Sequence, residues 1–188
     1  MTFDDGLEGL YRYALPILSS SRIPATLFLV AESLTPGGRA VDWIDGMAAG
    51  ARQTITVDQI LEMQEAGIAF GSHSYSHRDL RELSDAECEW DLRSSREVLE
   101  AILGGPVRTL AYPRGFHNER VRNAARRAGY SFAFGMDRTP EPGDHWSIPR
   151  IGVYGDNGLL TLRIKTSLWY PAVRWSLASS TFPKAKHR

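Results

Sequence analysis

Apolar residues in this chain follow two patterns, short continuous runs and stripes with helical spacing, which succeed one another along most of the sequence. Short continuous apolar runs are typical of strands in parallel sheets, and the run ATLFLVA at 25–31 has the pattern of a strand buried on both faces. We expect strands at 1–3, 25–31, 68–72, 107–111, 130–134 and 151–154.

Helical spacing and capping patterns occupy the stretches between these runs. Apolar residues recur at helical intervals over 7–18. Thr56 with Gln59, and Ser84 with Glu87, form capping-box patterns that predict two helix starts. The predicted helices after 56, after 84 and around 121–128 each end at a glycine: Gly67, Gly104 and Gly129.

Two stretches are less regular. The Gly-rich stretch 33–53, which contains Trp43, predicts a surface loop or a small insertion. Residues 159–177 are expected to be mostly helical, with a break at Pro171.

The alternation of strands and helices predicts an α/β fold with a parallel sheet. A chain of 188 residues is long enough for one domain, 1–188, which we divide into a core at 1–155 and a helical tail at 156–188. Lys+Arg and Asp+Glu number 22 each, and zero net charge argues against a nucleic-acid-binding protein. Cys88 is the only cysteine, which excludes an internal disulfide and a cysteine-based zinc site.

Three polar clusters each follow a predicted strand: DDG at 4–6, HSYSH at 73–77 and YPRG at 112–115. Each cluster alone has an ordinary interpretation as a turn or a helix cap. In a parallel α/β sheet or barrel, however, the carboxyl ends of the strands lie on one face. We therefore expect the three clusters to meet although they are far apart in sequence.

The side chains in these clusters suit a metal centre. Two histidines four positions apart can share one divalent ion, and an aspartate would supply a third ligand. Such a site leaves coordination positions open, so that the ion acidifies water and polarises a carbonyl group. A second, neighbouring carboxylate is then available as a general base. This combination of groups is suited to hydrolysis of an amide or an ester.

The segments TFDDG at 2–6, HSYSH at 73–77 and LAYPRG at 110–115 resemble the first three motifs of the polysaccharide deacetylases, the NodB-homology group of carbohydrate esterases. The resemblance runs from Met1 to about Ile151. It implies a distorted, incomplete (β/α) barrel, here with most of its first strand lacking. It also implies a hydrolase that removes N-acetyl groups from an N-acetylated polysaccharide or oligosaccharide, acting on non-peptide carbon–nitrogen bonds.

The resemblance assigns roles to individual residues. Asp4 corresponds to the catalytic base, and Asp5, His73 and His77 correspond to the ligands of one divalent metal ion, zinc or an ion such as cobalt or nickel. Ser74 would orient a histidine ligand. One wall of the substrate groove would consist of the third motif, in which the backbone N–H of Arg114 would stabilise the oxyanion: Tyr112, Pro113, Arg114 and Gly115.

The sequence departs from the family pattern at two places. Ala111 occupies the position of an arginine that often pairs with the base, as in a subgroup with Phe-Ala-Tyr-Pro-like motifs linked to exopolysaccharides and envelope glycans. Arg150 is our candidate for the missing positive charge in catalysis, with a surface arginine as the alternative. The family's late histidine, a general acid, is not evident, which leaves His117 and His145 as candidates.

Other functions remain open at this stage. The same residues would suit a deacylase or amidohydrolase acting on a non-sugar amide, a non-haem iron oxygenase, or an inactive glycan-binding relative. The adjacent second carboxylate favours hydrolysis.

Location and partners also remain open. No signal peptide is visible, and both the bacterial cell envelope and the cytoplasm fit the sequence. The short stub before Asp4 suggests a chain truncated at its N-terminus. The tail, rich in Trp, Leu and basic residues, predicts either a helix that packs on the barrel or peripheral membrane contact.

Overall fold

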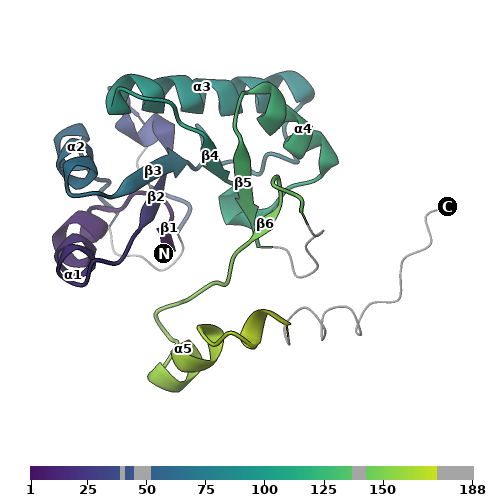
Figure 1. The fold of residues 1–188 in the computed structure, drawn as a ribbon. Helices are drawn as coiled ribbons and strands as arrows, with labels where there is room; N and C mark the ends of the chain where they lie inside the picture. The colour runs from purple at the N-terminus through teal and green to yellow at the C-terminus, as the bar shows by residue number, and fades with distance from the viewer. Residues whose placement is uncertain (39–40, 45–51, 137–142, 173–188) are drawn as a thin grey trace.

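The computed structural model describes residues 1–38, 41–44, 52–136 and 143–172. Its centre is a sheet of six parallel strands whose spatial order follows the chain order (Figure 1). The strands are β1 (Thr2–Phe3), β2 (Thr26–Leu29), β3 (Ala69–Ser72), β4 (Thr109–Ala111), β5 (Phe132–Gly135) and β6 (Ile148–Pro149). The fold is the predicted α/β type, a curled half-barrel with β1 and β6 as its two edges.

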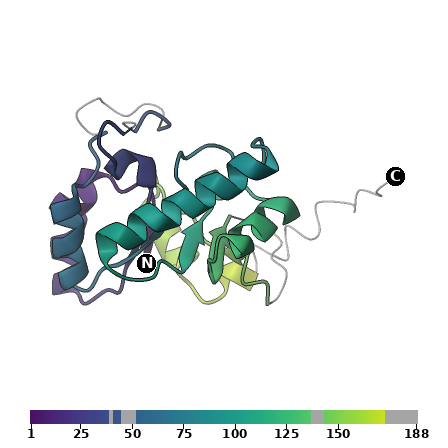
Figure 2. The ribbon, with the colours of Figure 1, turned by 90° about the horizontal axis from the view of Figure 1, so that it is seen from above.

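Most of the described helices lie between successive strands in the chain, and α5 follows the last strand. They are the π-helix η1 (Leu10–Ala14), α1 (Leu15–Ser20), the 3₁₀-helix η2 (Ala31–Leu34), α2 (Val57–Glu65), α3 (Asp85–Leu103), the 3₁₀-helix η4 (Pro113–Gly115), α4 (Glu119–Arg127) and α5 (Leu159–Lys165). The long helix α3 lies across one face of the sheet with α4 beside it (Figures 1 and 2). Within the described residues, no helix is long and apolar enough to cross a membrane.

Local sequence signals determine where two of these helices start. Both predicted capping boxes are present: the side chains of Thr56 and Ser84 accept hydrogen bonds from the backbone of Gln59 and Glu87, whose side chains accept in return. Helix α3 ends as predicted at Gly104, whose φ of 67° is in the left-handed region that glycine adopts readily.

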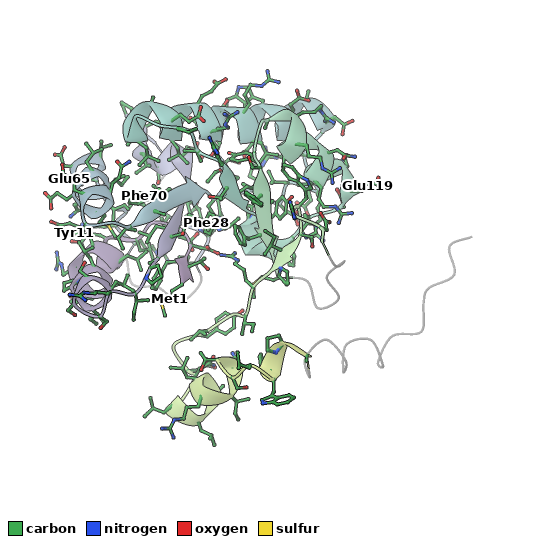
Figure 3. The ribbon with its side chains drawn as sticks, viewed as in Figure 1. Met1, Tyr11, Phe28, Glu65, Phe70 and Glu119 are labelled. Atoms are coloured by element: carbon green, nitrogen blue, oxygen red, sulfur yellow. The ribbon has the colours of Figure 1, made fainter. Side chains whose placement is uncertain are left out.

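The core lies between the helices and the sheet. Residues of β2 such as Leu27 and Phe28 are fully buried, as the continuous apolar run predicted. In Figure 3, Phe28 lies within the sheet, whereas Glu65 and Glu119 lie on outer helices. The buried stripe of α3 contains three apolar residues, Cys88, Leu92 and Leu99, and two polar ones, Asp91 and Ser95.

Two predicted elements differ from the structure. The strand expected at 151–154 is wrong, because the last strand is β6, which ends at Pro149. Proline has no N–H to donate and is therefore tolerated in an edge strand such as β6. In the tail, α5 ends at Lys165, and the chain turns over 166–169, before Pro171 rather than at it. The part of the predicted helix at 173–177 lies outside the described residues.

Helix α5, in the described part of the tail, buries none of its side chains. In Figure 1, α5 lies apart from the sheet and the other helices. The expectation of a tail helix packed on the barrel therefore does not hold for α5.

Candidate metal centre and active site

The three polar clusters meet where the parallel strands end, at the side of the sheet formed by their carboxyl ends (the carboxyl edge). Asp5 follows β1, and His73 and His77 follow β3. One ligand atom from each of these three residues lies within 4.8 Å of the others. Asp5 Oδ1 is 3.4 Å from His77 Nε2 and 3.8 Å from His73 Nε2. Parallel strand order thus brings together residues that are about seventy positions apart in the sequence.

The orientation of His73 is fixed by the neighbouring strand. Its Nδ1 lies 2.7 Å from the backbone carbonyl oxygen of Ala111, at the end of β4. A carbonyl oxygen only accepts, so Nδ1 donates this hydrogen bond, and Nε2 is the ring nitrogen that faces Asp5. With 2% of its surface exposed, the His73 side chain has little freedom to turn away.

The arrangement of Asp5, His73 and His77 fits a divalent metal ion. It provides one carboxylate and two imidazoles, with Nε2 of His73 directed at the shared space. Both histidines are buried, while Asp5 is half-buried.

Asp4 points to a different partner from Asp5. Arg150, directly after β6, donates two hydrogen bonds to it, from Nη1 to Oδ1 at 2.7 Å and from Nη2 to Oδ2 at 2.8 Å. Burial alone would raise the pKa of Asp4, but the facing His73 and the Arg150 guanidinium hold it below its usual value. Asp4 is therefore ionised at neutral pH, 3.8 Å from His73 Nε2.

The backbone of the site is strained. Among the described residues, five non-glycine residues have φ in the left-handed region, and four of them lie in the three clusters: Asp5, Ser74, His77 and Arg114. Such conformations cost about 1–3 kcal/mol each and persist where surrounding contacts fix them, often at functional sites. Ser74 contributes one such contact: its Oγ accepts a hydrogen bond from the backbone N–H of His77. It thus orients the backbone of a histidine rather than its ring.

The third cluster is mostly inside the protein. Tyr112 is fully buried and donates a hydrogen bond to the carbonyl oxygen of Trp146, and Pro113 and Gly115 are buried as well. Gly115 has φ +74°, and a Cβ there would overlap with Met136. Only Arg114 is exposed, so the others shape this wall from within instead of presenting side chains to a substrate.

The two candidate general acids lie at different ends of the sheet. His145 packs against Phe132, the first residue of β5, and its carbonyl oxygen accepts from Ala133, so it lies at the amino edge, away from the metal centre. The ring of His117 packs against that of Tyr112, which directly follows β4, and so lies at the carboxyl edge. The topology leaves His117 as the better placed of the two.

Two residues around the centre were not predicted. The indole N–H of Trp43 donates to Asp5 Oδ1 at 2.8 Å, and its ring stacks on His77 at 4.4 Å between centroids. Asp91, on α3, is bonded to the loop between the histidines. The available signals were a tryptophan between two acidic residues in a Gly-rich loop and an acid on the buried stripe of a helix.

The fold and this centre define an incomplete (β/α) barrel with an Asp–His–His group at the carboxyl edge of its strands. The chain belongs to the polysaccharide deacetylase family, whose model matches residues 1–133. This finding confirms the resemblance drawn from the three motifs.

Individual relatives agree with this family. The poly-β-1,6-N-acetyl-D-glucosamine N-deacetylase of Staphylococcus aureus is 27% identical over 168 residues, covering 83% of this chain and 54% of that protein. YxkH of Bacillus subtilis is 28% identical over 143 residues, covering 76% of this chain and 44% of YxkH. The chain thus spans about half the length of these relatives.

Solved structures show the same fold. The deacetylase PplD of Streptococcus pyogenes, in complex with acetate, superposes with a TM-score of 0.73. The match covers 88% of this chain and 69% of that one, with 23% sequence identity.

Proposed function

We propose that this chain is a metal-dependent polysaccharide deacetylase that hydrolyses the acetamide of an N-acetylated glycan. The observation that carries the proposal is that the adjacent carboxylates of Asp4 and Asp5 have different partners. Asp5 belongs to the Asp–His–His group, whereas Asp4 is held by Arg150 beside it. A ligand set next to a separate ionised carboxylate is the arrangement that metal-assisted amide hydrolysis requires.

Asp5, His73 and His77 would hold one divalent ion. One carboxylate and two imidazoles suit zinc, and cobalt or nickel would accept the same ligands. The bound ion would polarise the amide carbonyl and lower the pKa of water.

The protein's own residues account for the proton transfer. Asp4 accepts the proton of the attacking water, because each carboxylate oxygen keeps a lone pair beyond the one used by Arg150. Arg150 helps to lower the pKa of Asp4, and its two hydrogen bonds fix the plane of the carboxylate, as a bidentate guanidinium does. Arg114, the exposed residue of the third cluster, supplies its backbone N–H to the developing oxyanion. His117 is the candidate that returns the proton to the leaving amine.

The relative from Staphylococcus aureus supports a polymer of N-acetylglucosamine as substrate. The match covers only 54% of that relative's length, so the substrate assignment is a separate part of the proposal.

The test is acetate release from two acetylated substrates, poly-β-1,6-N-acetylglucosamine oligomers and chitooligosaccharides. We expect acetate release after loading with zinc or cobalt, its loss after chelation, and recovery on adding back metal. Glycan binding without acetate release would instead identify an inactive binding module. Oxygen consumption with iron would identify an oxygenase, and acetate release only from a non-sugar amide would identify a different deacylase. Each of these three results would overturn the proposal.

A further inference from the structure

A carboxylate buried on α3 contacts the loop between the two histidine ligands. Asp91 is 2% exposed. Its Oδ1 accepts the backbone N–H of Tyr75 at 2.8 Å. Its Oδ2 accepts the backbone N–H of Ser76 at 3.1 Å and the Ser76 hydroxyl at 2.6 Å. One side chain from a helix therefore forms hydrogen bonds with Tyr75 and Ser76, two of the three residues between the histidines.

This loop needs external support. Ser74 and His77, on either side of the bonded residues, both have φ in the left-handed region, at 69° and 55°. Residues other than glycine adopt that region uncommonly and at a cost, so two such residues in one short loop need surrounding contacts that hold them. Asp91 provides three such contacts, and they fall between the two strained positions.

Hydrogen bonds from α3 also fix the start of the loop, where it leaves β3. The Ser72 hydroxyl accepts the backbone N–H of Ser74 at 3.1 Å and is bonded to the Ser95 hydroxyl at 2.7 Å. Ser95 lies one helical turn after Asp91 on the same face of α3. The only polar residues on the buried stripe of α3 are thus directed at the loop that carries the histidines. Burying a carboxylate costs free energy unless donors compensate it, and here three donors on the loop do so.

We propose that Asp91 is a positioning residue of the metal centre, which fixes the 74–77 loop so that His73 and His77 face Asp5 together. The role rests on the proposed metal centre and is independent of which glycan is the substrate. When Asp91 is removed, three donors on the loop lose their acceptor, and His77, on the far side of the loop from β3, loses its fixed distance to Asp5.

The test measures metal binding and not catalysis. We expect Asp91→Ala to raise the dissociation constant for zinc, measured by chelator competition on the full chain, by about 10- to 100-fold. The visible spectrum of the cobalt-loaded protein should change as well, because it reports the arrangement of the ligands. Asp91→Asn, which keeps one acceptor oxygen, should show a smaller effect. Glu97→Ala, an exposed acid on the same helix, should bind like the unmodified chain.

The outcomes separate this role from simple stabilisation and from the proposed function. Folded Asp91 variants with unchanged affinity and cobalt spectrum would overturn the role of Asp91, even if their melting temperatures fell. If Asp91→Ala does not fold, Asp91→Asn decides the question. An unmodified chain that binds neither zinc nor cobalt would overturn the metal centre itself, and the proposed function with it.

Discussion

Adjacent residues in this site face different partners because the chain turns sharply between them. Asp5 has a φ of 69°, and its carboxylate contacts Trp43 and the histidines, whereas the carboxylate of Asp4 contacts Arg150. Two carboxylates at neighbouring positions thus acquire separate environments. Because of this separation, the role of Asp4 can be tested by a substitution that leaves Asp5 unchanged.

We predict that Asp4→Asn keeps bound metal and loses about 10²–10⁴-fold in turnover, because the amide cannot accept the proton of water. Asp5→Ala and His73→Ala should lose both metal and activity, because each removes a ligand atom. Metal content by elemental analysis and acetate release give the two readouts. Normal turnover in Asp4→Asn would remove Asp4 from the role of base.

Arg150 is expected to act through Asp4. Arg150→Ala should lower turnover on the order of 100-fold, because Asp4 loses a neighbouring positive charge and the two hydrogen bonds that orient it. Arg150→Lys restores one charge without the bidentate geometry and should recover only part of the loss. Turnover, metal content and melting temperature are measured together. Unchanged turnover in Arg150→Ala would make this arginine structural only.

At the scale of elements, the sequence was most informative where the signal is local. Capping boxes, terminal glycines and apolar runs are properties of a few neighbouring residues, and the helices and strands that they predicted are present, except for the strand at 151–154. The last strand was missed because β6 is only two residues long, ends in proline and lies at an edge. Its apolar pattern is therefore weaker than that of the unpaired segment 151–154 that follows.

The same distinction applies to the site. The order of parallel strands predicted that Asp5, His73 and His77 would meet, because that rule needs no side-chain geometry. The contacts of Trp43 and Asp91 depend on how a loop and a helix pack on the sheet. An acid on a helix is usually exposed, so burial of Asp91 could be recognised only with α3 in place.

At the scale of the whole molecule, we propose that the exposed apolar side chains of the tail contact an anionic lipid surface. Leu159, Leu160, Leu168 and Trp169 are 73–95% exposed, and Arg163 and Lys165 lie among them. Such a combination binds at membrane interfaces, where leucine and tryptophan enter the lipid and basic residues face its charges.

We therefore expect the full chain to co-sediment with vesicles that contain phosphatidylglycerol. The double variant Leu159→Ser and Leu160→Ser should pellet several-fold less, whereas Thr161→Ser, on the same helix, should pellet like the unmodified chain. Equal pelleting of all three proteins would refute membrane contact through α5.

The Asp4–Arg150 pair also has a consequence for the timing of biosynthesis. It joins the two edges of an open sheet across 146 positions of sequence. At about 5–20 residues per second, the ribosome adds Arg150 roughly 7–30 s after Asp4. During that interval the carboxylate of Asp4 exists without its guanidinium partner. The nascent protein therefore acquires its complete active site only after the final strand has been made, whatever the rate at which the earlier strands assemble.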